Sequence, residues 1–431
     1  MSRRKILRRL SVGLVDQVVS SGSNFAATLI AARWLDRAGF GVFSVGMVLA
    51  LVAVGLSKAM CTEALLVRPG DDPDGRSARA SAALGSAVSL GAVLSGTFFI
   101  GSAVLNGPLA SCLAVVAVLT PFVVLQDTYR MVAFSNQRPS RALVSDLLWV
   151  VLMAVGFIVA RKFRLSPASL IAAWMMAGAL AGVATIAHAR LAPAVRSGFA
   201  WVSENRDLSV PYALTFVSTQ GAGYFSSLIL AATAGVTAAG GVRGAIALFG
   251  PLNILAIGAY VSLVPEGLRL AERSPTRLLH LCKVAGIGLS AWAAMVTVFF
   301  LVLPDSAGEA ILGSTWLGSR ELVPYVGVAA VASGAIAGAL VGLSALTEAS
   351  RILRARLITM PATLGLPALG GIFAGGRGLA IGLAIANWIA VVVMWRDLSH
   401  AAAARADQIA NQSESSQQTG KDRTDQSGAL N

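Results

Sequence analysis

Residues 143–160 read LVSDLLWVVLMAVGFIVA, an almost continuous run of aliphatic and aromatic side chains. A helix of about 20 such residues crosses the hydrocarbon core of a bilayer, because each residue rises by about 1.5 Å. Similar runs recur along the whole chain. They predict twelve membrane spans, at residues 11–32, 40–60, 82–104, 108–126, 143–160, 167–188, 209–233, 241–263, 282–303, 323–345, 357–375 and 379–395.

The overall composition agrees with a membrane protein. The chain has 431 residues, of which 56% are hydrophobic and only 13% are charged, and its mean hydropathy is +0.72. Soluble domains carry about 25% charged residues. A net charge of +13 is also typical of nucleic-acid binding. However, the basic residues lie in short polar segments between apolar runs and form no single patch. The composition therefore predicts an all-α polytopic membrane protein with no nucleic-acid partner.

The distribution of Lys and Arg predicts the orientation of the spans. If the N-terminus is cytoplasmic, 26 of the 34 basic residues fall in cytoplasmic segments and 8 fall outside. This bias is the one that orients membrane proteins, and it places both termini in the cytoplasm. We interpret the first apolar stretch as a retained span rather than a signal peptide. The excess of Arg over Lys suggests a GC-rich bacterial genome, and hence the bacterial inner (plasma) membrane.

The chain contains a weak internal repeat. At an offset of 200 residues, positions 25–42 (FAATLIAARWLDRAGFGV) align with positions 225–242 (FSSLILAATAGVTAAGGV), and six of the 18 pairs are identical. Because six spans per half is an even number, such a repeat is parallel, with its axis along the membrane normal. We expect two six-helix lobes facing a central cavity, at residues 1–200 and 201–400. Residues 401–431, rich in Gln, Ser, Asp and Ala, are expected to form a disordered cytoplasmic tail.

Three segments resemble a known group of transporters. They are residues 16–44 (DQVVSSGSNFAATLIAARWLDRAGFGVFS), 126–146 (QDTYRMVAFSNQRPSRALVSD) and 243–269 (RGAIALFGPLNILAIGAYVSLVPEGLR). They are similar to the multidrug/oligosaccharidyl-lipid/polysaccharide (MOP) flippase superfamily, in particular to its polysaccharide and O-antigen export branch. The multidrug efflux branch also has twelve spans.

The resemblance implies a membrane transporter that flips a lipid-linked oligosaccharide, a precursor of an exopolysaccharide, from the inner to the outer leaflet by alternating access. Two alternatives remain open. One is cation-coupled multidrug efflux, and the other is a non-transporting membrane scaffold of a polysaccharide synthesis complex. The implied partners are the lipid-linked saccharide, membrane lipids and, for polysaccharide synthesis, a polymerase or glycosyltransferases.

The first span carries a polar face. Asp16 lies about one and a half turns inside it, and Gln17 and Asn24 follow with several hydroxyl residues at helical spacing. Ionisable residues at membrane depth are costly and are functional by default. We interpret Gln17 and Asn24 as substrate-binding residues in the wall of a cavity, and Asp16 as a proton or cation coupling site. The alternatives are polar side chains that join helices and an Asp16 that reaches the headgroups.

Two residues of span eight are further candidates for substrate binding. Arg243 is the only basic residue at the predicted outer start of this span, and a guanidinium matches phosphate oxygens in a bidentate manner. It is either a contact for the phosphates of a lipid carrier or an anchor at the membrane interface. Asn253 follows Pro251 and either binds a sugar or repairs the backbone that the proline leaves unpaired.

The remaining polar and special residues favour structural roles. We interpret Asp127 and Arg130 as a solvated pair on a helix face, although an ion pair in a gate is an alternative. Gly334, Gly338 and Gly342 predict close helix packing. The prolines at positions 361 and 367 predict a kink in span eleven.

The motifs of common enzymes are absent from the sequence. It contains no P-loop, no G-x-S-x-G and no H-E-x-x-H. Its three cysteines lie far apart and show neither a disulfide framework nor metal-ligand spacing. We therefore expect no enzyme activity, no cofactor, no catalytic residue and no metal site.

Overall fold

The helices of the N-terminal half begin at polar caps that the sequence supplies. The computed structural model describes residues 3–68, 72–163 and 165–428. Asp36, Asp72 and Ser166 each accept a hydrogen bond from a backbone N–H three residues further on, which fixes the start of a helix. The helices of this half are α1 (Arg3–Trp34), α2 (Arg37–Ser57), the π-helix η1 (Lys58–Thr62), α3 (Glu63–Val67), α4 (Pro73–Val104), α5 (Gly107–Ser135), α6 (Pro139–Phe163) and α7 (Pro167–Ala189).

A short helix, α8 (Val195–Glu204), leads into the C-terminal half. In this half the passes are interrupted more often. The seventh pass contains a π-helix, and the eighth is divided at Phe249. The elements are α9 (Arg206–Phe216), η2 (Val217–Gly221), α10 (Ala222–Ala234), α11 (Val236–Leu248), α12 (Gly250–Arg273), α13 (Pro275–Val302), α14 (Asp305–Leu312), η3 (Gly313–Thr315), α15 (Trp316–Arg320), α16 (Val323–Ala345) and α17 (Ala349–Gly428).

The described chain is helical throughout, and each predicted span lies in a helical pass to within a residue. By length and composition alone, nine helices of the described residues are long and apolar enough to cross a membrane. The long helix α17 counts once among the nine although it folds back on itself. The other passes are α1 and the interrupted series α9, η2 and α10. The predicted fold class, an all-α polytopic membrane protein, is confirmed.

Helix α17 contains a hairpin that makes the last two passes. Its non-helical residues are Ala374 and Gly375, and Gly375 has a φ of 58°, which a residue without a Cβ adopts readily. A Cβ at Gly370 would collide with the backbone of Gly378. The two halves of the hairpin therefore pack through a close backbone contact between these two glycines. The break thus falls at Gly375. Pro361 and Pro367 lie inside the helical stretch, and the kink predicted there stays a prediction.

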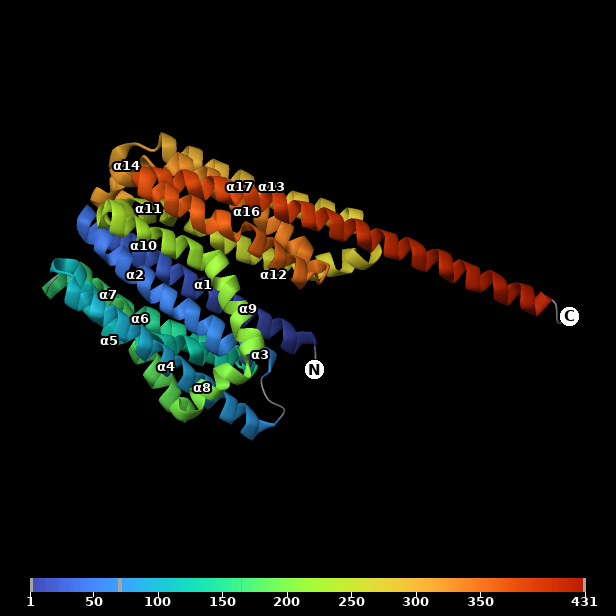
Figure 1. Ribbon diagram of the computed structural model, residues 1–431, viewed down its shortest axis with the longest axis horizontal. Helices are drawn as coiled ribbons and strands as arrows, with labels where there is room; N and C mark the ends of the chain where they lie inside the picture. Colours follow the sequence, from blue (N-terminus) through green and yellow to red (C-terminus); the bar gives the residue numbers. More distant parts are fainter. Residues whose placement is uncertain (1–2, 69–71, 164, 429–431) are drawn as a thin grey trace.

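The second half of α17 continues well beyond the bundle. Figure 1 shows it projecting away from the other helices as one long rod. The structure is helical as far as Gly428, where the sequence predicts disorder. The run AAAARADQIA at positions 401–410 consists of good helix formers and has no glycine or proline to end the helix.

Each half of the chain packs mainly with itself. In the N-terminal lobe, α4 packs on α5, α7 packs on α5 and α6, and α1 packs on α6. In the C-terminal lobe, α16 packs on α13 and α17, and α10 packs on α17. The repeat at an offset of 200 agrees with the helix ends, because α1 ends at Trp34 and α10 ends at Ala234. The assignment of residues 1–200 and 201–400 to separate domains stays a prediction.

Both chain termini lie at the same end of the bundle, which we call the terminal end, and we call the opposite end the far end (Figure 1). The lobes meet closely at the far end. A Cβ at Gly41 in α2 would collide with the carbonyl group of Val236 in α11. Arg37 also donates from Nε to the carbonyl oxygen of Ser314 at 2.7 Å. Close contact of α2 and α11 therefore joins the lobes at this end.

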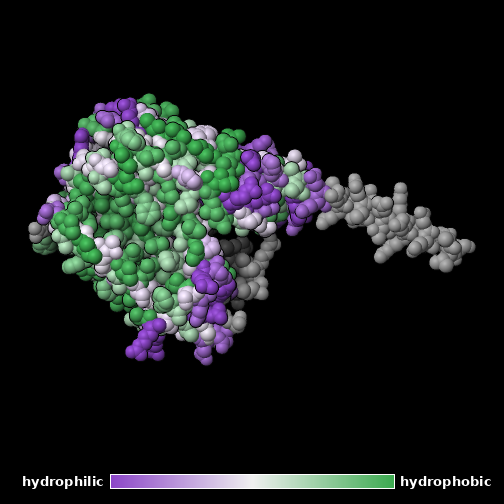
Figure 2. All heavy atoms as spheres, viewed as in Figure 1, coloured by the Kyte–Doolittle hydropathy of each residue, from purple (hydrophilic) through white to green (hydrophobic). Residues whose placement is uncertain are grey.

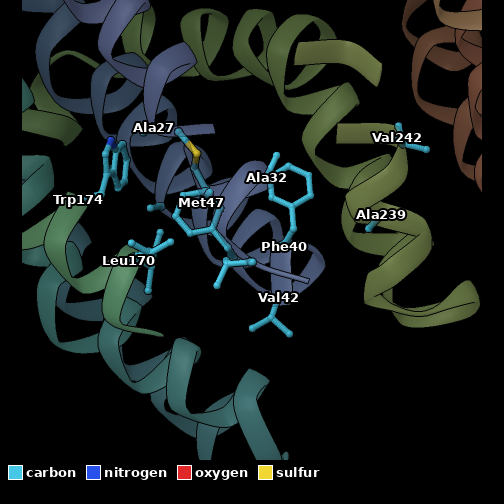
Figure 3. Packing of buried hydrophobic residues seen from close by; sticks show 14 of the residues in the cluster. Ala27, Ala32, Phe40, Val42, Met47, Leu170, Trp174, Ala239 and Val242 are labelled. Atoms are coloured by element: carbon cyan, nitrogen blue, oxygen red, sulfur yellow. The ribbon is translucent and has the colours of Figure 1, made fainter. Parts of the chain in front are cut away.

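A single large hydrophobic core, which includes residues of α2 and α11, connects the two lobes next to this contact. Figure 3 shows Phe40 and Val42 of α2 with Ala239 and Val242 of α11. Met47 and Trp174 extend the same cluster into the N-terminal lobe. Outside this core, apolar side chains cover most of the visible face of the bundle, and hydrophilic side chains gather near the two ends (Figure 2). This distribution is the one that a bilayer requires.

Candidate functional site

A cavity of about 470 Å³ lies between the lobes. Five passes contribute to its wall: α1, the η2–α10 pass, the α11–α12 pass, α16 and the second half of α17. Its size is that of a typical ligand pocket. The polar and charged residues that line it are Ser21, Asn24, Thr28, Thr219, Gln220, Arg243, Asn253, Ser333 and Asn387.

The break in the eighth pass shapes the middle of this cavity. Phe249 ends α11, and Gly250 begins α12. A Cβ at Gly250 would lie 2.6 Å from Cδ2 of Phe25, so glycine lets the Phe25 ring of α1 approach the break. The break redirects the chain between Arg243 and Asn253, and both residues line the cavity.

Arg243 is the one ionisable residue among those that line the cavity, and no Asp or Glu accompanies it there. Its Nη2 atom lies 4.0 Å from Sδ of Met47, and its Nε atom is buried without a hydrogen-bond partner. Within the described residues the guanidinium has no ion pair. A buried cation without a counter-ion is costly, so an anion in the cavity would be bound strongly.

The three asparagine side chains of the cavity differ in how many hydrogen bonds they already make within the protein. Asn24 accepts a hydrogen bond from Nε1 of Trp174 at 3.2 Å, which orients the side chain and leaves its NH₂ group available. Asn387 donates to the carbonyl oxygen of Ala329 and to Oγ of Ser333. The side-chain amide of Asn253 makes no hydrogen bond with any described residue. The predicted repair of the backbone at Pro251 is therefore not its role in this structure.

Three of the four predicted substrate-binding residues come together in this cavity. Asn24, Arg243 and Asn253 all line it, although they come from α1, α11 and α12. Gln17 does not line it. Its amide instead donates to Oγ of Ser21 at 3.1 Å, one turn further along α1, and Ser21 is part of the wall. Their role in substrate binding stays a prediction.

A second polar site lies inside the N-terminal lobe, around Arg130. The guanidinium contacts three carboxylates: Oδ2 of Asp16 at 2.9 Å from Nη2, Oδ1 of Asp127 at 3.0 Å from Nη1, and Oδ1 of Asp146 at 2.9 Å from Nε. We call these four residues the aspartate cluster. All four are buried, and Asp16 is only 1% exposed. The interpretation of Asp127 and Arg130 as a solvated pair is therefore wrong, because both are buried and Arg130 contacts Asp16 of α1 and Asp146 of α6.

The aspartate cluster holds more negative than positive charge. One guanidinium faces three carboxyl groups, and Gln126 adds a hydrogen bond to Oδ1 of Asp146 at 3.2 Å. Oδ1 of Asp16 and Oδ2 of Asp146 are buried without a hydrogen-bond partner. A low-dielectric interior does not tolerate such an imbalance, so the site requires additional positive charge, as protons or as a cation.

Asp146 is the member of the cluster that sequence reasoning missed. It lies one turn inside the predicted span 143–160, where a carboxylate at membrane depth is itself a signal of function. Gln126 lies at the end of another predicted span. Gln126 packs directly against Gly182 of α7, where a Cβ would lie 2.7 Å from Cβ of Gln126. The absence of a side chain there lets α5 and α7 approach at this depth.

These elements define a class of protein: a polytopic α-helical membrane protein with two lobes, a cavity between them and a buried acidic cluster in one lobe. No protein-family model matches the sequence. No curated protein matches it either.

Solved structures, in contrast, match over nearly the whole chain. An inward-facing multidrug resistance MATE family transporter of the MOP superfamily is 14% identical, with a TM-score of 0.67, covering 93% of this chain and 98% of the other. The lipid II flippase MurJ in an inward closed conformation is 12% identical, with a TM-score of 0.62 and coverage of 92% and 90%. An outward-facing MATE family transporter of the MOP superfamily is 15% identical, with a TM-score of 0.55 and coverage of 93% and 96%.

The chain thus has the fold of the MOP superfamily, and the resemblance seen in its sequence is confirmed at the level of the fold. Together with its many apolar helices, this fold makes it a multi-pass membrane protein.

Proposed function

We propose that this chain is a membrane transporter that flips a lipid-linked oligosaccharide between leaflets by alternating access. The observation that carries the proposal is the guanidinium of Arg243 in the cavity between the lobes, which forms no ion pair with any residue that the structure describes. A lipid carrier linked through phosphates brings negative charge to this point. The amides of Asn24, Asn253 and Asn387 supply hydrogen bonds of the kind that sugar hydroxyls require.

The chemistry of the cavity separates this proposal from efflux of cationic drugs. A cavity for a cation requires a carboxylate or an aromatic cage, whereas this cavity has an arginine and no Asp or Glu. An organic cation would have to approach Arg243 at close range. Three buried aspartates instead surround Arg130 in the aspartate cluster, and no residue of this cluster lines the cavity.

The aspartate cluster favours coupling of transport to protons or Na⁺. Asp16 lies on α1, two turns before Asn24, so a change in its charge acts on a helix that forms the cavity wall. We propose that Asp16 is a coupling residue. The coupling ion, a proton or Na⁺, is then taken up by the carboxyl groups around Arg130. Cation-coupled multidrug efflux stays the second candidate, because the same cluster supports it.

The test is the leaflet location of the lipid-linked saccharide in a deletion strain, read with a membrane-impermeant glycan probe. The intact gene should restore surface exposure, and Arg243→Gln should not. Arg320→Gln is the matched control, because Arg320 is an exposed arginine at the far end, paired with Asp305 at a distance from the cavity. Normal exposure without the gene, together with increased sensitivity to cationic drugs, would favour efflux. Full activity of Arg243→Gln and Asn24→Ala would favour the scaffold.

A further inference from the structure

A separate cavity lies at the terminal end of the N-terminal lobe, where α4, α5 and α7 meet the turn between α5 and α6. It has a volume of about 430 Å³. We call it the arginine cavity, after Arg76, Arg138 and Arg141, which line it together with Tyr129 and Asn136. It shares no residue with the cavity between the lobes.

The described charges that line the arginine cavity are all positive. Of the part of the chain that the structure describes, three arginines line it, and no Asp or Glu does. Among the described residues, none of the three guanidinium groups has an ion pair or a side-chain hydrogen bond. Three unpaired guanidinium groups on one cavity therefore form a site for an anion with more than one acceptor oxygen.

Tyr129 provides a second and independent observation. Its side chain lines the arginine cavity, yet the residue is only 3% exposed. Buried tyrosine hydroxyls usually have a hydrogen-bond partner. In the described part of the chain this hydroxyl has none, and it is not among the fully buried polar atoms, so it is a free donor that is accessible from the cavity.

The backbone around the cavity brings helix ends of both signs to the arginines. Helix α6 begins at Pro139, directly after Arg138, which brings the positive end of its dipole to the arginines. The C-terminus of α5 is closed by its own turn, because the backbone N–H of Arg138 donates to the carbonyl oxygen of Ala133 at 2.8 Å. One of the carbonyl groups at that helix end is thereby satisfied within the chain.

We propose that the arginine cavity binds a phosphate group, held by Arg76, Arg138 and Arg141 and by the hydroxyl of Tyr129. Guanidinium groups match phosphate oxygens in a bidentate manner, and a phosphate accepts several such bonds at once. The phosphate is that of an anionic lipid headgroup or of a soluble phosphate compound. Its position at the end of the membrane-spanning helices makes both sources accessible. The proposal does not depend on the transported substrate.

The test uses the purified full chain in detergent. Native mass spectrometry measures retention of phosphatidylglycerol against phosphatidylcholine, and thermal unfolding measures stabilisation by inorganic pyrophosphate. The variants are Tyr129→Phe and the double variant Arg138→Gln/Arg141→Gln. The matched control is Arg196→Gln/Arg206→Gln, since both arginines are exposed, lie outside the arginine cavity and have no side-chain partner among the described residues.

We expect the double variant and Tyr129→Phe each to lower the affinity by about tenfold or more, because each removes hydrogen bonds to a charged group. The control should stay within about twofold. Binding of phosphatidylglycerol alone identifies a lipid headgroup, and stabilisation by pyrophosphate with the same variant pattern identifies a soluble phosphate. Equal losses in the double variant and the control, or no loss in either cavity variant, would overturn the proposal.

Discussion

Nη2 of Arg130 lies 2.9 Å from Oδ2 of Asp16, and this ion pair joins α5 to α1 in the interior of the N-terminal lobe. The same guanidinium also contacts Asp127 and Asp146. One cation therefore holds three helices together. The carboxylates outnumber it, so the loss of the cation and the loss of one carboxylate should have different consequences.

The first prediction is that Arg130→Gln destabilises the protein far more than Asp16→Asn does. Removal of the arginine leaves three carboxyl groups buried without a cation, and an uncompensated buried charge costs about 3–5 kcal/mol. Asp16→Asn removes charge from a cluster that already has too much of it. Thermal unfolding of the purified protein in detergent measures both. If Asp16→Asn lowers the melting temperature as much as Arg130→Gln does, the negative charge of Asp16 is not in excess in the cluster.

The second prediction concerns coupling and rests on the proposed function. Asp16→Asn and Asp146→Asn should each weaken the dependence of transport on a proton or Na⁺ gradient, because each variant lowers the excess of carboxylates over the guanidinium from two to one. Transport into proteoliposomes under an imposed gradient measures this. Asp305→Asn is the control, since Asp305 forms an exposed pair with Arg320 at the far end. Unchanged gradient dependence in both cluster variants would exclude the aspartate cluster as the coupling site.

The third prediction sets stability against function at Arg243. Its Nε atom is buried without a partner, and the guanidinium has no counter-ion among the described residues. Arg243→Gln removes an unsatisfied charge, so the melting temperature should stay the same or rise. Substrate flipping should nevertheless fall by tenfold or more, because a charge-assisted hydrogen bond is worth about 1.5–3 kcal/mol. A marked drop in the melting temperature would instead indicate that Arg243 stabilises the fold.

The fold was predictable from the sequence because span length is a local property. The run at residues 143–160 identified α6, which the structure extends to Pro139–Phe163. The repeat at an offset of 200 anticipated that Trp34 and Ala234 end equivalent helices. The prolines did not locate the break in α17, because a proline inside a membrane helix is accommodated by its neighbours. The actual break requires the positive φ of Gly375.

The sites were predictable only in part. Asn24, Arg243 and Asn253 were recognisable as polar residues at membrane depth, and they do share one cavity. The partners of Asp16 were not recognisable, since Asp146 and Arg130 are more than 100 positions away in the sequence. Only the packing of α1 on α6 and of α5 on α6 brings these residues together. A pattern along one helix does not contain that information.

The fourth prediction is that Gly41→Ala opens the far end. A Cβ at this position would collide with the carbonyl group of Val236, whereas a Cβ at Gly22 in α1 would meet no atom within 4 Å. Gly22→Ala is therefore the control. Spin labels at Asn106→Cys and Glu309→Cys, in exposed far-end segments of the two lobes, measure the separation. We expect a longer distance in Gly41→Ala and no change in Gly22→Ala. Unchanged distances in both would show that α2 and α11 do not control closure at this end.

The fifth prediction tests the hairpin of α17. A Cβ at Gly378 would collide with the carbonyl group of Gly370, so Gly378→Ala must separate the last two passes. Such overpacking costs about 1–3 kcal/mol, and the melting temperature should fall. A Cβ at Gly365 in the same helix would meet no atom within 4 Å. Gly365→Ala should therefore be neutral or stabilise the helix by up to about 1 kcal/mol, because alanine favours the helical backbone over glycine. If the two variants have equal melting temperatures, the close approach of Gly370 and Gly378 does not contribute to stability.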